Sequence, residues 1–300
     1  MKNWQAGKVT LCAVLLASSG CLRQYVIDSA AQALSASTGG GAFARDDDPE
    51  LVAESLPFAL KVMESLLEET PENRGLLTAL AAGFTQYAQG FVLPRADDAQ
   101  LREADLIQQR VKRLHLRAHR YGLRALEVRH PGFTAALVKD AGSAVSELDR
   151  EDVEAMYWTG ASLMAAIAIS ADDMSVVAEL PRGEALMNRA LELDPDWGLG
   201  ALHEFFIAYE GRSEAMGGSP QRAQEHFVQA VELQGGTKAS PYVALAEAVA
   251  VKQQDRELFE RLLTQALAVD PDAAPEHRLA NTIAQRRARW LRAHVEDLIL

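Results

Sequence analysis

Cysteine is nearly absent from this chain of 300 residues, which contains only Cys12 and Cys21. Cys12 lies within an apolar stretch at the N-terminus, and Cys21 follows that stretch. If residues 1–20 are removed as a signal peptide, one cysteine remains, which leaves no partner for a disulfide within the mature chain. Stability must then come from apolar packing, for which 48% hydrophobic residues are ample.

Long hydrophobic runs are also scarce, because the sequence has one short apolar run near the N-terminus and no second hydrophobic span after it. The apolar run of residues 9–17 follows Lys2 and Lys8, and its length is typical of a signal-peptide core and too short for a membrane span. The next residues, Ser18 to Cys21, form a lipobox-like site, although Ser18 stands where Leu is usual. We therefore predict a lipoprotein signal peptide over 1–20 and lipidation of Cys21. The alternative is an ordinary secretory peptide beside an incidental cysteine.

Basic residues are fewer than acidic ones, 30 against 42, so the formal net charge is −12. Removal of Lys2 and Lys8 with the signal peptide would bring it to −14. Such an acidic protein is a poor candidate for binding nucleic acid or an anionic membrane surface.

Motifs of enzymes and metal sites are missing as well. His203-Glu204 begins like a zinc-protease helix, but Ile207 occupies the place of the second histidine. His115 and His119 have metal-ligand spacing, yet arginines surround them and no carboxylate completes the set. The sequence also has no P-loop, Rossmann glycine pattern or CxxC motif. We expect no enzyme activity and no cofactor or metal, although a site assembled from distant residues would escape this test.

What the sequence does contain is helical periodicity, because apolar positions recur at intervals of three and four residues and no convincing strand alternation occurs. Asp48-Pro49 and Ser240-Pro241 each pair a capping side chain with a proline suited to a first helical turn. The predicted class is all-α.

An internal repeat indicates the architecture. The segments RALELDPD (189–196), QAVELQGG (229–236) and QALAVDPD (265–272) are spaced by 40 and 36 residues, and residues 66–71 and 125–131 match the same frame. Each segment resembles a helix end followed by a proline or glycine stop. Periods near 34 residues predict degenerate tetratricopeptide-like hairpins stacked as an α-solenoid superhelix. We expect about five hairpins within a domain over 46–300, preceded by a lipid anchor, short helix and Gly-rich link over 21–45.

Residues 158–171 contain no charge, and on a helical wheel their apolar or small side chains lie on all sides. An all-round apolar helix is usually buried in the core. In the alternative, small residues leave space for an apolar ligand in a passage. The candidates for lining it are Tyr157, Trp158, Ala161, Met164 and Ala165.

Two arginine-rich stretches stand out in the acidic chain. The first extends from Arg110 to Arg124, and the second from Arg286 to Arg292. Such stretches are often solvated helix faces, here close in sequence to Glu103 and Asp105. In the alternative they dock an acidic partner, and the candidate docking residues are Arg113, Arg117, Arg286 and Arg289.

Segments spread along the whole domain resemble the T component (TatT) of tripartite ATP-independent periplasmic (TRAP) transporters. They are DDDPELV (46–52), LPFALK (56–61), RGLL (74–77), GFTQY (83–87), YGLRALE (121–127), HPGF (130–133), DVEAMYWTGAS (152–162), EALM (184–187), GALHEF (200–205), ASPY (239–242) and LANTIAQRRARW (279–290). The resemblance implies a tetratricopeptide-like homotrimer with an apolar pore in each subunit. It also implies docking to the solute-binding P component.

These observations predict a lipoprotein accessory subunit of a TRAP-type transporter, anchored to a bacterial envelope membrane and facing the periplasm. It would hand ligands, including hydrophobic ones, to or from the P component. The alternative is a tetratricopeptide scaffold lipoprotein that binds other envelope proteins or peptides.

Overall fold

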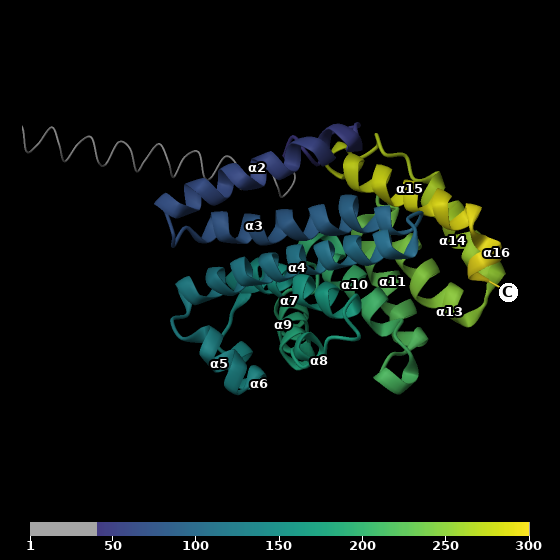
Figure 1. The fold of residues 1–300 in the computed structure, drawn as a ribbon. Helices are drawn as coiled ribbons and strands as arrows, with labels where there is room; N and C mark the ends of the chain where they lie inside the picture. Colours follow the sequence, from purple (N-terminus) through teal and green to yellow (C-terminus); the bar gives the residue numbers. More distant parts are fainter. Residues whose placement is uncertain (1–40, 300) are drawn as a thin grey trace, which may run out of the picture.

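The computed structural model describes residues 41–299, and every regular element in this range is a helix (Figure 1). The predicted all-α class is confirmed for this part of the chain. The predicted signal peptide, the lipidation site Cys21 and the short helix after it lie outside the described residues.

The first half of the domain is built on long helices joined by shorter ones. These are α2 (Pro49–Glu69), α3 (Arg74–Tyr87), α4 (Leu101–Arg129), α5 (Phe133–Lys139), α6 (Ala141–Ser146), α7 (Val153–Ala168), α8 (Met174–Val177) and α9 (Leu180–Leu193). α3 continues through a π-helical turn, Ala88–Val92, and a 3-10 turn, Leu93–Ala96.

The second half contains α10 (Trp197–Glu210), α11 (Pro220–Gln234), α12 (Ser240–Leu245), α13 (Val251–Gln253), α14 (Arg256–Ala268), α15 (Arg278–Ala293) and α16 (Val295–Leu298). A π-helical turn, Ala246–Ala250, joins α12 to α13. Single 3-10 turns occur at Arg150–Asp152, Glu214–Met216 and Pro275–His277. The first turn of α10 is irregular, because residues 198–200 have positive φ.

Several helix boundaries follow local signals of the sequence. Asp48 caps α2, since its carboxylate accepts hydrogen bonds from the N–H groups of Glu50 and Leu51, both at 3.0 Å. The five repeat segments coincide with the ends of α2, α4, α9, α11 and α14. The cap predicted at Ser240 is wrong, because Ala239 is the N-cap and its N–H donates to Asn281 on α15 at 2.9 Å.

Helices α3, α4, α7 and α9 pack in sequence against one another to form the first core. Close approach depends on small residues: a Cβ at Gly122 on α4 would lie 2.1 Å from the hydroxyl oxygen of Thr159 on α7. Similarly, a Cβ at Gly160 on α7 would lie 2.6 Å from the sulfur of Met187 on α9. Substitution at Gly122 would push α4 and α7 apart, because the backbone of Thr159 is also close, whereas substitution at Gly160 would displace the side chain of Met187.

A second core lies in the C-terminal half. It begins at Ile207 on α10, whose neighbour Phe206 belongs to the first core, and it continues to Ile299. Helix α10 therefore contributes to both cores, so the two halves are packed as one continuous body.

The two ends of the described chain meet. Figure 1 shows α2 beside α15, and contacts between these helices agree with the view. The N–H of Leu279 donates to the carbonyl of Ala44 at 3.0 Å, and Arg278 donates to the carbonyl of Arg45 at 3.0 Å. The last long helix thus closes against the first.

One helical segment within the described residues, Arg74–Ala96, has the length and composition of a membrane span. However, 72% of its most apolar window is buried inside the fold. Its contacts with α2, α4 and α7 explain the apolar composition as that of a core helix.

Candidate functional site

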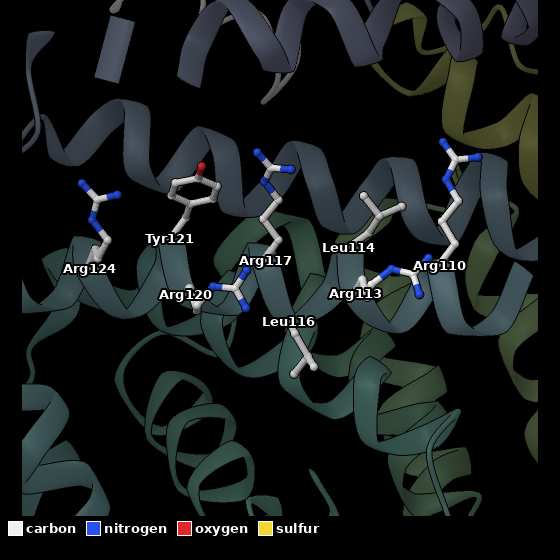
Figure 2. A pocket seen from close by; sticks show the side chains of 8 residues that line it. All are labelled: Arg110, Arg113, Leu114, Leu116, Arg117, Arg120, Tyr121 and Arg124. Carbon is white, nitrogen blue, oxygen red and sulfur yellow. The ribbon is translucent and has the colours of Figure 1, made fainter. Parts of the chain in front are cut away.

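Five arginines lie along one face of α4, and Figure 2 shows their side chains lining a pocket of about 710 Å³. Because they recur every three or four residues over four helical turns, they form a stripe about 20 Å long. Leu114, Leu116 and Tyr121 line the same pocket. We call this set the α4 arginine row: Arg110, Arg113, Arg117, Arg120 and Arg124.

The opposite face of α4 determines the direction of the row. Val111, Ala118 and Ala125 are fully buried against the neighbouring helices. The Nδ1 of His119 lies 2.9 Å from the carbonyl oxygen of Thr159 on α7, so this ring is held by a hydrogen bond to the backbone of α7. Burial also lowers the pKa of His115 to about 4, which keeps that side chain neutral at physiological pH. The arginines are therefore directed away from the core.

Arg117 is the member of the row that pairs with an acidic residue of the described fold. Its guanidinium forms an ion pair with Glu64 on α2 and lies 4.8 Å from the ring centre of Phe84 on α3. Glu64 also accepts hydrogen bonds from Lys61 and from the hydroxyl of Tyr121. Burial alone would raise the pKa of Glu64, but these hydrogen bonds outweigh it and the pKa lies below its usual value. Glu64 therefore stays ionised and balances one arginine.

The remaining members of the row are not balanced by acids. Arg110 contacts the hydroxyl of Tyr87 at 3.5 Å, and Arg124 donates to the carbonyl of Pro71 at 3.0 Å. Within residues 41–299, Arg113 and Arg120 have no acidic partner, and neither Glu103 nor Asp105 pairs with the row. The row thus concentrates positive charge in an acidic protein. A planar guanidinium can bind a carboxylate or phosphate through two hydrogen bonds, so the surface suits an anionic partner.

The two docking candidates on α15 lie outside this pocket. Arg286 forms an ion pair with Glu50 on α2 and takes part in closing the chain ends. Arg289 is exposed. The structure therefore groups Arg113 and Arg117 with three further arginines of α4. Glu64 was not among the sequence candidates, because it lies 53 positions from Arg117 and no local pattern connects the two.

The candidate pore residues lie on α7. Tyr157 packs edge-on against Trp158 at 4.8 Å and lies 4.6 Å from Trp197 on α10, and burial raises the pKa of its hydroxyl. Met164 is 9% exposed and fills the space over Gly183 on α9. Ala161 and Ala165 are half-buried. None of the five lines the α4 pocket.

Comparison with known proteins agrees with the resemblance noted in the sequence. The model of the family described as "TRAP transporter T-component" matches residues 45–299. An uncharacterized protein of Treponema pallidum (strain Nichols) is 32% identical over 269 residues, which cover 86% of this chain and 82% of that protein. The family match extends over nearly all of the described helical body, including the α4 arginine row. The chain therefore belongs to the TRAP transporter T-component family.

Proposed function

We propose that this protein is the periplasm-facing accessory subunit of a TRAP-type transporter and that it docks the solute-binding P component through the α4 arginine row. Membership of the T-component family, which is transport-associated, supports the transporter role. The observation that carries the docking surface is the surplus of guanidinium groups on one face of α4 in a chain of net charge −12.

Docking through this surface would be electrostatic and reversible. Exposed arginines steer an acidic partner and increase the association rate, while contributing modestly to affinity. Arg113 and Arg120 are the members free to engage a partner, because Arg117 is held by Glu64. Such a contact permits release after each transfer, as a handoff protein requires.

Ligand would pass through an apolar pore or cavity bordered by α7. The candidates remain Tyr157, Trp158, Ala161, Met164 and Ala165, of which Tyr157 and Trp158 belong to an aromatic group with Trp197. We further propose that the helical hairpins are degenerate tetratricopeptide-like units, that the protein is a homotrimer, and that lipidated Cys21 anchors it to the envelope membrane. A lipid anchor holds a protein by burying acyl chains, which needs no membrane-spanning helix.

The docking proposal is tested with the purified full chain and its P component. Arg113→Glu is expected to weaken binding by about tenfold, equal to about 1.4 kcal/mol, and binding of the wild type should weaken as salt rises. The matched control is Arg261→Glu, which reverses the charge of an exposed side chain on α14, outside the α4 arginine row. Sedimentation analysis of the same samples measures the oligomeric state and so tests whether the protein is a trimer.

Two results would count against the proposal. If Arg113→Glu binds the P component as tightly as the Arg261→Glu control, the row is not the docking surface. If the wild type does not bind the P component at any salt concentration but binds defined envelope peptides, the results favour the scaffold alternative.

A further inference from the structure

Two histidines from neighbouring helices, α10 and α11, lie in contact with each other. His203 on α10 and His226 on α11 have their Nδ1 atoms 2.8 Å apart and their ring centres 5.1 Å apart. Both rings line a pocket of about 340 Å³, together with Arg222, Glu225, Val228 and Gln229. We call this set the histidine pocket. It is separate in its residues from the α4 arginine row.

Packing fixes the position of both rings. Phe206 on α10 stacks on His226 with ring centres 5.1 Å apart and planes inclined by 21°. The helices themselves approach closely one turn away, where a Cβ at Gly200 would lie 3.2 Å from the Cα of Ala230. Gly200 has a φ of +81°, which an L side chain rarely adopts, so this approach depends on glycine. The facing imidazoles are thus a consequence of the α10–α11 contact.

We propose that His203 and His226 bind a divalent transition-metal ion such as Zn²⁺ through their Nδ1 atoms. Zinc lies about 2.0–2.1 Å from an imidazole nitrogen, so two nitrogens on one ion are about 3–3.4 Å apart. The observed separation of 2.8 Å would need to widen by only a few tenths of an ångström. Without metal, one Nδ1 donates a hydrogen bond to the other. On binding, the donor's proton moves to its own Nε2, and both Nδ1 lone pairs face the ion.

The remaining coordination positions would be open. Within residues 41–299 no group of three or more His, Cys, Asp and Glu side chains is arranged to hold a metal ion. Water would complete the coordination, in a pocket that Glu225 and Gln229 also line. A site with two imidazoles and water binds more weakly than a closed structural zinc site. The histidine pocket should therefore bind metal exchangeably.

The charges around the pair favour a cation. Asp196 acts on His203, and Glu210 and Glu225 act on His226. Arg222 opposes a cation, but its guanidinium is engaged by Glu210 at 2.6 Å and by the carbonyl of Gly217 at 2.7 Å. Burial lowers the pKa of both histidines, and the neighbouring His203 lowers the pKa of His226 further. Both imidazoles are then neutral at physiological pH, which is the form that binds metal.

The experiment titrates Zn²⁺ into metal-stripped, untagged full chain at pH 7.5 by isothermal calorimetry. We expect one ion per chain, with affinity at least tenfold weaker in His203→Gln and in His226→Gln. His277→Gln is the matched control, because His277 is another half-buried histidine but lies far along the chain before α15. Melting curves show whether each variant is folded.

A second measurement does not depend on any variant. Co²⁺ bound to the wild type should give a visible absorption spectrum typical of nitrogen ligands, and this spectrum should fade as the pH falls and the imidazoles are protonated. Equal Zn²⁺ affinity in the wild type and in both variants would overturn the proposal. The absence of any Zn²⁺ binding at millimolar concentration would also overturn it. His203 and His226 would then serve only as a hydrogen bond between α10 and α11.

Discussion

Arg286 on α15 forms an ion pair with Glu50 on α2, although 236 positions separate them in the sequence. The neighbouring Arg287 forms a second, less exposed cluster with other parts of the fold: it pairs with Asp97, after the turn that follows α3, at 2.6 Å and with Glu247, in the π-helical turn after α12, at 2.7 Å. Helix α15 is therefore connected by ion pairs to α2 and to two other segments, in addition to packing.

These two clusters predict different effects on stability. Glu50→Ala should leave the melting temperature almost unchanged, because both partners of this pair are well exposed and water screens their attraction. Arg287→Ala should lower it clearly, since Arg287 pairs with two acids and its guanidinium lies 4.4 Å from the ring centre of Trp290. Scanning calorimetry of both variants measures the difference. Equal melting temperatures would contradict this ranking.

A buried carboxylate joins three helices near the start of α7. Asp152 has no exposed side-chain surface, and its oxygens contact Arg74 at 2.9 Å and Arg129 and His130 at 2.8 Å. Asp152→Ala should cost about 3–5 kcal/mol, because it leaves these donors facing an empty site. Glu151→Ala is the control, since Glu151 also pairs with Arg129 but is 78% exposed. Urea denaturation measures both, and a loss no larger than the control's would show that the network adds little.

Glu64 gives a prediction about pH. Its pKa is lower in the folded protein than the usual value, so its stabilising effect is fully present above about pH 5 and is lost as the pH falls through the folded pKa. The difference in melting temperature between the wild type and Glu64→Gln should therefore be largest near neutral pH and shrink in acid. A difference that stays constant from pH 7 to pH 3.5 would mean that ionisation of Glu64 is unimportant.

The role of α7 can be tested with one pair of substitutions. If α7 borders a ligand passage, Ala161→Phe and Ala165→Phe should block uptake of an apolar fluorescent probe while the protein stays folded. If these residues only pack, overfilling should cost about 1–3 kcal/mol and lower the melting temperature, without a selective loss of probe binding. Thermal melts and probe titrations on the same samples separate the two outcomes. Ala168→Phe serves as the control, because Ala168 is the last residue of the same helix.

Several features of the fold could be predicted from the sequence because they depend on neighbouring residues. Asp48 and Pro49 start α2 as expected, since a cap involves only the next few N–H groups. The repeat segments coincide with helix ends for the same reason, because a proline or glycine acts on the turn before it. The family could also be identified from short segments, and the family model confirms it. The stripe of arginines on α4 follows from helical spacing alone.

Contacts between helices required the tertiary structure. The ion pair of Glu64 with Arg117 and the meeting of His203 with His226 depend on the angle and distance at which helices cross, which periodicity does not specify. The cap predicted at Ser240 is wrong because the helix begins one residue earlier than expected, with Ala239 as the N-cap, and the N–H of Ala239 donates to Asn281 on a distant helix. By itself the sequence determined the all-α class, the start of α2, the ends of the five helices that carry the repeat segments, and the family. The tertiary structure decided which charged and aromatic side chains face one another, because close packing between helices, and not local backbone preference, positions them.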